Sequence, residues 1–285
     1  MKWTIQKALD EGTAKPFIAR LMSGMMELRD HYLNALDISH REREARRLAF
    51  DELYEAVLNE MFAMRKAAKT LHTLVEGHRA KLLSGEIVGR QRNAIEIHEA
   101  IHHDLRDLLS RFLNSAVRAA KSLQKVTAHL GLDIGGFFAN DANFERRMTV
   151  LASAGHEPLV EYFRLARQDW SQGLIDRRNA LEHEGWVLPD VKYPPTPEGG
   201  VSMIEPPVDG VPVSQWVAAM CRHVLAFVEN TLAYTFQTML SRGVAIVEIP
   251  KSRRDPSYPQ RFRVTLRAVE GVAPWTPQYE PQGFE

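Results

Sequence analysis

Apolar residues recur three or four positions apart through most of the first two-thirds of the chain. This spacing places them on one face of a helix, so each run predicts an amphipathic helix with one buried side. Gly131 and the glycines that follow it end the third run, because glycine readily adopts the left-handed conformation at a helix end. The three runs cover residues 17–33, 50–71 and 101–130.

Two further helices are expected in the second half of the chain. One runs from Pro158 to about Gly185, because proline favours the first helical turn and glycine the end of a helix. The other is strongly apolar and runs from a Ser214 cap to about Leu240. With the first three runs, these helices predict an all-α protein built as a helical bundle.

The remaining segments predict a small amount of β-structure. Residues 188–212 are rich in proline and long for a connection in a compact domain. Within them, Val201–Ile204 and Val211–Val213 could pair as a small hairpin. Alternating apolar and polar residues near the C-terminus predict two short strands, Val244–Ile249 and Arg261–Val269.

We therefore expect three consecutive parts. Residues 1–89 form an N-terminal helical extension packed on the core. Residues 90–242 form the helical bundle, with the long proline-rich loop or hairpin before its last helix. Residues 243–285 form a small β-hairpin followed by a loose proline-rich tail.

Composition narrows the class of protein. The hydrophobic content of 45% excludes wholesale disorder. The 36 basic and 36 acidic residues cancel, so nucleic acid can be attracted only by a local site. One cysteine, Cys221, excludes an intrachain disulfide and fits a reducing compartment. No stretch approaches the roughly 20 apolar residues of a membrane helix, and the N-terminus lacks a signal-peptide core. We expect a cytoplasmic protein without membrane contact.

The strongest candidate for chemistry is the sequence Arg-Asn-Ala-Leu-Glu-His, residues 178–183, at the end of the fourth helix. Arginine binds phosphate through two parallel hydrogen bonds, and histidine can give or take a proton near neutral pH. These groups suffice for metal-free RNA cleavage: a base removes the ribose 2′-hydroxyl proton, the oxygen attacks its phosphorus, and a cation stabilises the added charge. Asn179 could orient either partner.

The spacing within this motif is not simple. On a regular helix Arg178 and His183 point roughly 140° apart, so one straight helix would not direct both at one phosphate. Either the helix ends between them or a symmetry-related chain completes the site. The alternative without chemistry is an ordinary ion pair between Arg178 and Glu182, four residues apart, beside a histidine that the helix dipole favours.

Residues 178–186, RNALEHEGW, resemble the signature of HEPN domains. That signature is an arginine, four to six further residues and a histidine, often with a polar residue after the arginine. The preceding long helix carries residues 112–120, FLNSAVRAA, which are similar to the corresponding HEPN helix. A final apolar helix follows the motif, as in that bundle. The resemblance covers roughly residues 90–242.

This resemblance implies an all-α bundle and a homodimer in which the two motifs meet across the interface. It also implies a metal-independent endoribonuclease that needs no cofactor. His183 would act as general acid or base, Arg178 would bind the scissile phosphate of RNA, and Asn179 would orient them. The resemblance suggests a toxin or phage-defence role, with a nucleotidyltransferase antitoxin as partner. Because the family has non-catalytic members, the alternative is a nucleotide-binding, RNA-binding or scaffold protein.

Two other patterns compete with this motif. His98, Glu99 and His102 match HExxH, which on a helix can hold Zn²⁺ with the glutamate activating water. No third ligand stands out, and His98 falls on the apolar stripe of the third helix, so a core histidine is the simpler interpretation. Arg92 and His98 also have the arginine–histidine spacing, with Asn93 after the arginine. This pair would open a helix rather than close one, and we interpret it as a decoy.

The C-terminal region holds a basic cluster that could follow an RNA backbone. Charged outer faces are also normal on edge strands, where they block aggregation, and we favour that interpretation. Cys221, in an apolar helix, is interpreted as a packing residue. The cluster consists of Lys251, Arg253, Arg254, Arg261, Arg263 and Arg267.

Overall fold

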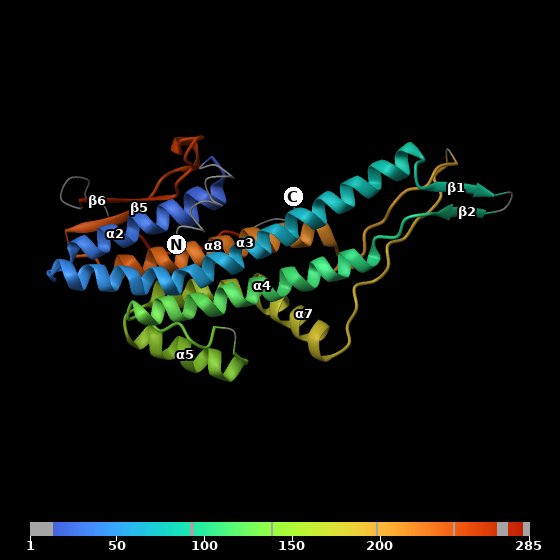
Figure 1. Ribbon diagram of the computed structural model, residues 1–285. Coiled ribbons are helices and arrows are strands. Elements are labelled where there is room, and N and C mark those ends of the chain that lie inside the picture. Colours follow the sequence, from blue (N-terminus) through green and yellow to red (C-terminus); the bar gives the residue numbers. More distant parts are fainter. Residues whose placement is uncertain are drawn as a thin grey trace. The chain divides into compact units, whose positions relative to one another are not determined.

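The computed structural model describes residues 14–91, 94–137, 139–197, 199–241, 243–266 and 273–281. Within these residues the chain is mostly helical, with short antiparallel strand pairs (Figure 1). The mostly helical class expected from the sequence is therefore confirmed. Among the described residues, none of the helices combines the length and the apolar character that crossing a bilayer would require.

The chain forms two compact units, each assembled from separate segments. Helices α3 (His40–Ser84), α4 (His102–His129) and α8 (Val213–Met239) contribute residues to both. The three consecutive parts expected from the sequence stay a prediction. The first unit comprises Met1–Glu60, Arg118–Gln172 and Val224–Glu280, and the second comprises Met61–Val117, Gly173–His223 and Pro281–Glu285.

The first unit buries a cluster of aromatic rings between its helices. Phe137 stacks on Phe227 with ring centroids 4.6 Å apart, and Phe163 and Trp170 contact the same ring of Phe227. Phe163, Trp170 and Phe227 lie on helical segments that bury one face, and Phe137 lies in a turn. The other elements of this unit are a π-helix (Ile18–Gly24), α2 (Met25–Ala35), α5 (Asp141–Ser153), α6 (Glu157–Ala166), a π-helical turn (Arg167–Ser171), a 3₁₀ turn (Lys251–Arg253), and β5 (Val244–Glu248) paired with β6 (Phe262–Leu266).

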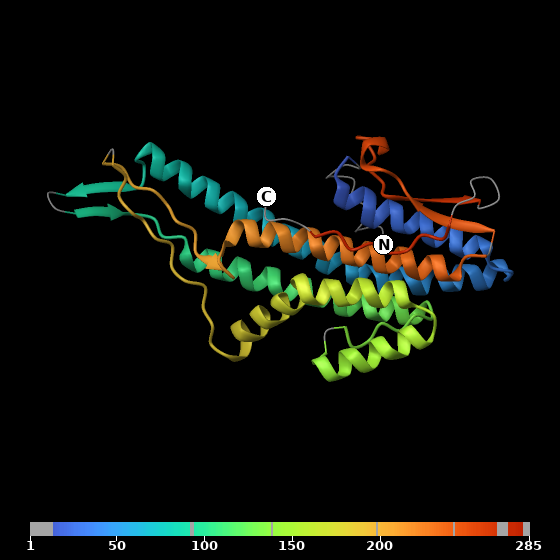
Figure 2. The same cartoon turned by 180° about the vertical axis from the view of Figure 1, so that it is seen from behind.

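The second unit packs α7 (Gln172–His183) and a long loop with the adjoining parts of α3, α4 and α8. Phe112 and Trp216 meet edge to face in its core, 6.4 Å apart. The loop after α7 runs out to the hairpin of β1 (Val88–Gln91) and β2 (Ala94–Ile97) and returns to α8 (Figures 1 and 2). Buried Leu82, Ile87 and Val201 hold loop and hairpin together.

Most of the predicted helices are found near their expected positions. The segment 17–33 becomes the π-helix followed by α2, and residues 101–130 become α4. The helix expected over residues 158–185 is a helical stretch from Glu157 to His183, with π-helical geometry at Arg167–Ser171. The helix expected over residues 50–71 is longer, because α3 runs from His40 to Ser84. Its first turns are mostly polar and exposed, and its last turns bury Val75 and Leu82.

One helix was missed. Residues 141–153 form α5, whose first turn is capped by the Asn140 side chain accepting a hydrogen bond from the Asn143 N–H at 3.0 Å. Asparagine is among the best residues for this capping role. Phe144, Met148 and Leu151 supply its buried face. The signal was present at helical spacing, but the helix is short and its surface is dominated by charge.

The strand pairing predicted for the proline-rich loop is wrong. Val201 and Ile204 bridge to Pro195 and Lys192, while Val211–Pro212 pairs with Pro207–Val208. The β1–β2 hairpin was not expected at all. At the C-terminus the predicted hairpin is confirmed, although the last predicted strand residues, 267–269, lie outside the described residues.

Candidate functional site

Both ends of the arginine–histidine motif lie on one helix. Arg178 and Asn179 are in the second half of α7, and His183 is its last residue. The chain then turns at Gly185, whose φ of +70° favours glycine. The N–H of Trp186 donates to the Ala180 carbonyl at 3.0 Å and closes this turn. The helix therefore does not end between Arg178 and His183, which removes one of the two ways to bring them together.

The Arg178 guanidinium is held on three sides. Its Nε donates to Asn114 Oδ1 of α4 at 3.4 Å, and its Nη1 donates to Asn179 Oδ1 at 3.1 Å. Its Nη2 lies 2.5 Å from Glu182 Oε2. The Arg178 side chain is 26% exposed, so the group is fixed in orientation yet reachable from solvent. Asn179 therefore contacts Arg178, and its role in orienting the two groups stays a prediction.

His183 lies at the open edge of this group. Its side chain is 66% exposed, and its Nε2 is 3.8 Å from the Glu182 Oε2 atom that pairs with Arg178. This distance is too long for a direct hydrogen bond, but it is an ion-pair distance once the imidazole is protonated. One Glu182 carboxylate oxygen therefore lies close to both Arg178 and His183.

One of these contacts is the Arg178–Glu182 ion pair, which the sequence offered as the interpretation without a catalytic role. Arg178 and Glu182 do pair four residues apart, and Glu182 occupies part of the fork that a phosphate would grip. In this arrangement a phosphate competes with Glu182 for the guanidinium. A partly exposed pair of this kind is worth at most about 1 kcal/mol, which a dianionic or chelated ligand can overcome.

The neighbouring Arg177 is used differently. Its Nε donates to Asp209 Oδ1 at 2.8 Å, and its guanidinium lies 5.3 Å from the centre of the Trp186 ring. Asp209 sits in the turn between β3 (Pro207–Val208) and β4 (Val211–Pro212), so this contact ties the end of α7 to the long loop. Arg177 therefore contributes to the fold, whereas the contacts of Arg178 lie within α7 and with Asn114 of α4.

The HExxH pattern does not form a helical metal site. His98 and Glu99 precede α4, and His102 is its first residue, so the two histidines do not share a helical face. The expectation of a buried His98 on the apolar stripe is also wrong, because His98 is exposed. Its ring lies against Gly89, where a Cβ would come within 2.4 Å of His98 Nε2. The absence of a side chain at Gly89 makes room for the ring.

Glu99 of this pattern has another role. It pairs with Lys81 Nζ at 2.5 Å and lies 3.7 Å from His78 Nδ1. The hydrogen bond from Lys81 holds the pKa of the Glu99 carboxyl below its usual range. Such a carboxylate is engaged in an ion pair rather than poised to activate water. Across the described ranges, no group of three or more histidine, cysteine, aspartate or glutamate side chains is arranged to hold a metal ion.

Two further sequence candidates are the Arg92–Asn93 pair and Cys221. Arg92 and Asn93 lie outside the described residues, and the helix expected to begin there is replaced by strand β2. Burial raises the pKa of the Cys221 thiol to about 11, so the less nucleophilic thiol form prevails at neutral pH.

The basic cluster is not one continuous patch. Arg261 is 7% exposed and binds buried Glu229 at 3.0 Å, and Arg254 pairs with Glu248 at 3.0 Å. These two arginines stabilise the first unit instead of facing outward. Lys251, Arg253 and Arg263 are exposed, and Arg267 lies outside the described residues.

Sequence reasoning missed part of the site. Asn114 lies within the stretch that resembles a HEPN helix, and no local pattern links it to Arg178, 64 residues away. No family model, curated protein or solved structure matches this chain.

Proposed function

We propose that this protein is a metal-independent endoribonuclease of the HEPN type, active as a homodimer. One observation carries the proposal: Arg178 is oriented by Asn114, Asn179 and Glu182, while His183 stands exposed beside the same Glu182 oxygen. A fixed guanidinium and an accessible imidazole are the two groups that metal-free RNA cleavage needs.

In the proposed reaction His183 accepts the proton of the ribose 2′-hydroxyl. The 2′-oxygen forms a bond to its own phosphorus, and the bond from phosphorus to the 5′-oxygen breaks. The leaving 5′-oxygen takes up a proton from water, which yields a 2′,3′-cyclic phosphate and a 5′-hydroxyl end, and the His183 imidazolium returns its proton to water. Arg178 stabilises the charge on the phosphorane, and Glu182 stabilises the imidazolium formed on the way.

A second copy of the chain is part of the proposal. The backbone positions of Arg178 and His183 point roughly 140° apart around α7, although both side chains reach the same Glu182 oxygen within one chain, so the second copy rests on the HEPN resemblance. A two-fold axis beside α7 would bring His183 of one protomer toward Arg178 of the other. Leu181 is half-buried and Val187 is 53% exposed, which supplies apolar surface for that contact. Light scattering at micromolar concentration should give twice the mass of the chain, and an active monomer would contradict this arrangement.

The biological setting belongs to the same proposal. A cytoplasmic toxin or phage-defence effector, neutralised by a nucleotidyltransferase antitoxin, is what the HEPN resemblance suggests. It rests on that resemblance alone. Co-purification with the product of a neighbouring nucleotidyltransferase gene, and loss of cell killing when both are expressed, would support it.

The enzymatic test uses end-labelled RNAs and the untagged protein with excess EDTA. Wild type should cleave, and Arg178→Ala should lose cleavage. Arg178→Lys should recover little, because an ammonium group cannot make the two parallel hydrogen bonds of a guanidinium to phosphate. Arg177→Ala is the matched control, since it removes the adjacent guanidinium and leaves the Arg178 contacts in place. Cleavage that stops with EDTA, or that survives Arg178→Ala, would refute the proposal.

A non-catalytic RNA-binding or scaffold protein is the second candidate. The observation that favours it is that Glu182 already occupies Arg178 within one chain. In that case wild type should bind RNA and leave it intact, and Arg178→Ala should weaken binding alone. Filter binding and gel analysis of the same samples distinguish the two candidates.

A further inference from the structure

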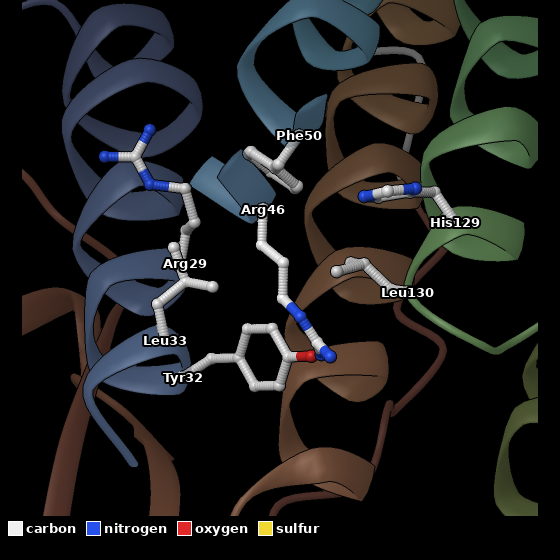
Figure 3. Close-up of a pocket in the computed structure, with 7 residues that line it drawn as sticks. All are labelled: Arg29, Tyr32, Leu33, Arg46, Phe50, His129 and Leu130. Carbon is white, nitrogen blue, oxygen red and sulfur yellow. The ribbon is translucent and has the colours of Figure 1, made fainter. Parts of the chain in front are cut away.

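A cavity of about 280 Å³ lies within the first unit, between α2, α3 and the end of α4 (Figure 3). Its floor is apolar: Leu33, Phe50 and Leu130 are each at most 6% exposed. Its volume is at the lower end of the range for small-molecule sites, so a ligand must be small. This cavity is unrelated to the arginine–histidine motif, which belongs to the second unit.

The polar groups around this floor can donate hydrogen bonds: the guanidinium of Arg46, the hydroxyl of Tyr32 and the imidazole of His129. The Arg46 guanidinium lies beside the Tyr32 hydroxyl, and His129 faces them from the opposite wall (Figure 3). No aspartate or glutamate is among the residues that line the cavity, all of which are described. A donor-lined rim above an apolar floor suits a ligand with an anionic group and an apolar body.

The second arginine at the cavity is not available to a ligand. The Arg29 guanidinium points away from the other lining side chains, and only its stem faces the space (Figure 3). Its nitrogens bind Asp51 and, at 2.7 Å, Asp30. Arg29 therefore closes the wall and leaves Arg46 as the cation that a ligand would meet.

Arg46 has a partner that a ligand could displace. Its Nη2 lies 2.8 Å from Glu42 Oε1, with side chains 46% and 47% exposed. Exposed pairs of this kind on a helix contribute little to stability. A carboxylate held between Arg46 and the Tyr32 hydroxyl, with its body on Phe50, would replace Glu42 as the anionic partner of Arg46.

We propose that this cavity binds a small carboxylic acid that carries a single ring. The ring would lie against Phe50, Leu33 and Leu130, and the carboxylate would accept hydrogen bonds from Arg46 and Tyr32. One arginine and one hydroxyl match the two oxygens of a carboxylate better than the larger donor set of a phosphate.

Calorimetric titration of the full chain with benzoate tests this proposal. Binding should saturate at or below about 10 mM, and benzamide, which has the same shape without the charge, should bind at least about tenfold more weakly. Arg46→Gln should weaken benzoate binding about tenfold or more, and Tyr32→Phe should weaken it less. Arg47→Gln is the matched control, because Arg47 has a similar exposed pair with Glu44 and does not line the cavity. It should change benzoate affinity less than about twofold.

Four results would overturn the proposal: no saturation with benzoate, equal affinity for benzamide, unchanged affinity in Arg46→Gln, or displacement of benzoate by equimolar inorganic phosphate. Circular dichroism of Arg46→Gln and Tyr32→Phe shows whether either variant has lost its fold. If one has, the other variant and the benzamide comparison still decide the matter. None of these outcomes depends on RNA cleavage, so this proposal and the proposed function can fail separately.

Discussion

Glu182 is the residue on which the two halves of the motif depend. Its Oε2 atom pairs with Arg178 at 2.5 Å and lies 3.8 Å from His183 Nε2. Removing its charge should have opposite effects on binding and on chemistry. Arg178 would be freed for phosphate, while the imidazolium of His183 would lose its nearby anion.

We therefore predict that Glu182→Gln lowers both the KM for RNA, by roughly threefold to tenfold, and kcat, by at least about tenfold. Steady-state kinetics on one RNA measure both constants. Glu184→Gln is the control, since this exposed carboxylate lies just beyond the end of α7. Unchanged KM and kcat in Glu182→Gln would show that Glu182 is only a surface partner of Arg178.

His78 allows a prediction for pH. It is 2% exposed, its Nε2 lies 2.8 Å from the Tyr193 hydroxyl, and Glu99 and Lys81 face its other side. Burial lowers the pKa of His78, against an opposing effect of Glu99. The folded state thus binds this proton less readily than the unfolded state, whose histidine titrates near pH 6.5. The free energy of unfolding should fall as the pH drops below about 6.5 toward the lowered pKa.

Urea unfolding at pH 7.5 and at pH 5.5 measures this effect. His78→Gln should reduce the loss of stability between the two pH values, because glutamine does not titrate. Some loss should remain, since burial also lowers the pKa of His156. An exposed histidine replaced in the same way, His72→Gln, is the control. If wild type and His78→Gln lose the same stability, His78 is not the source.

At this scale the sequence predicted part of the site. The pairing of Arg178 with Glu182 and the helix-end position of His183 follow from residue spacing alone. Asn114 does not, because its contact with Arg178 depends on how α4 and α7 pack. The exposure of His98 was also beyond reach, since it depends on a hairpin that helical periodicity does not reveal.

Among the elements, α8 begins with a cap supplied from far along the loop. The Glu205 carboxylate accepts a hydrogen bond from the Ser214 N–H at 3.1 Å and binds Arg79 Nη2 at 2.9 Å. The Glu205 side chain is only 7% exposed. A carboxylate at a helix N-terminus satisfies backbone donors and interacts favourably with the helix dipole.

Glu205→Ala should therefore reduce the free energy of unfolding by about 1–3 kcal/mol, because it leaves a backbone donor and Arg79 without this partner. Glu76→Ala is a matched control. Glu76 also pairs with Arg79, but its side chain is 49% exposed, so its loss should cost less than about 0.5 kcal/mol. Denaturant unfolding compares the two variants. Equal losses would mean that burial and capping add nothing at Glu205.

The sequence predicts the long helices better than the short strands, and the difference has a physical reason. Helices α4 and α8 carry long apolar runs, and a periodic signal over many residues is hard to mistake. Strands β1 and β2 have four residues each and are held by a small core with Val201 from the distant loop. The pairing of Ile204 with Lys192, rather than with 211–213, is set by the same tertiary packing.

At the scale of the whole molecule, a buried ion network joins three distant parts of the first unit. Glu229 of α8 has a side chain with 0% exposure and pairs with Arg20 near the N-terminus and Arg261 beside β6. Burial alone would raise the pKa of Glu229, but the two arginines outweigh it and lower the pKa. The carboxylate is therefore charged, and its partners depend on it.

Replacing Glu229 with glutamine should destabilise the protein by about 3–5 kcal/mol, because two arginines would lose a buried counter-charge. Glu248→Gln is the comparison, since Glu248 binds Arg261 and Arg254 but its side chain is 32% exposed. Its cost should be clearly smaller. Thermal and denaturant unfolding give both values. A loss below about 1 kcal/mol for Glu229→Gln would show that the network does not hold this unit together.

The central claim is that Arg178 and His183 cleave RNA without a metal ion. Single-turnover cleavage of one RNA by wild type and His183→Ala, both in EDTA, tests it most directly. Wild type should cleave and leave 2′,3′-cyclic phosphate ends, while His183→Ala should be about 10²–10⁴-fold slower. His183→Ala should remain folded because the side chain is 66% exposed, and His98→Ala, at another exposed histidine, should cleave like wild type. A chelator-sensitive wild type, or equal rates for wild type and His183→Ala, would contradict the account.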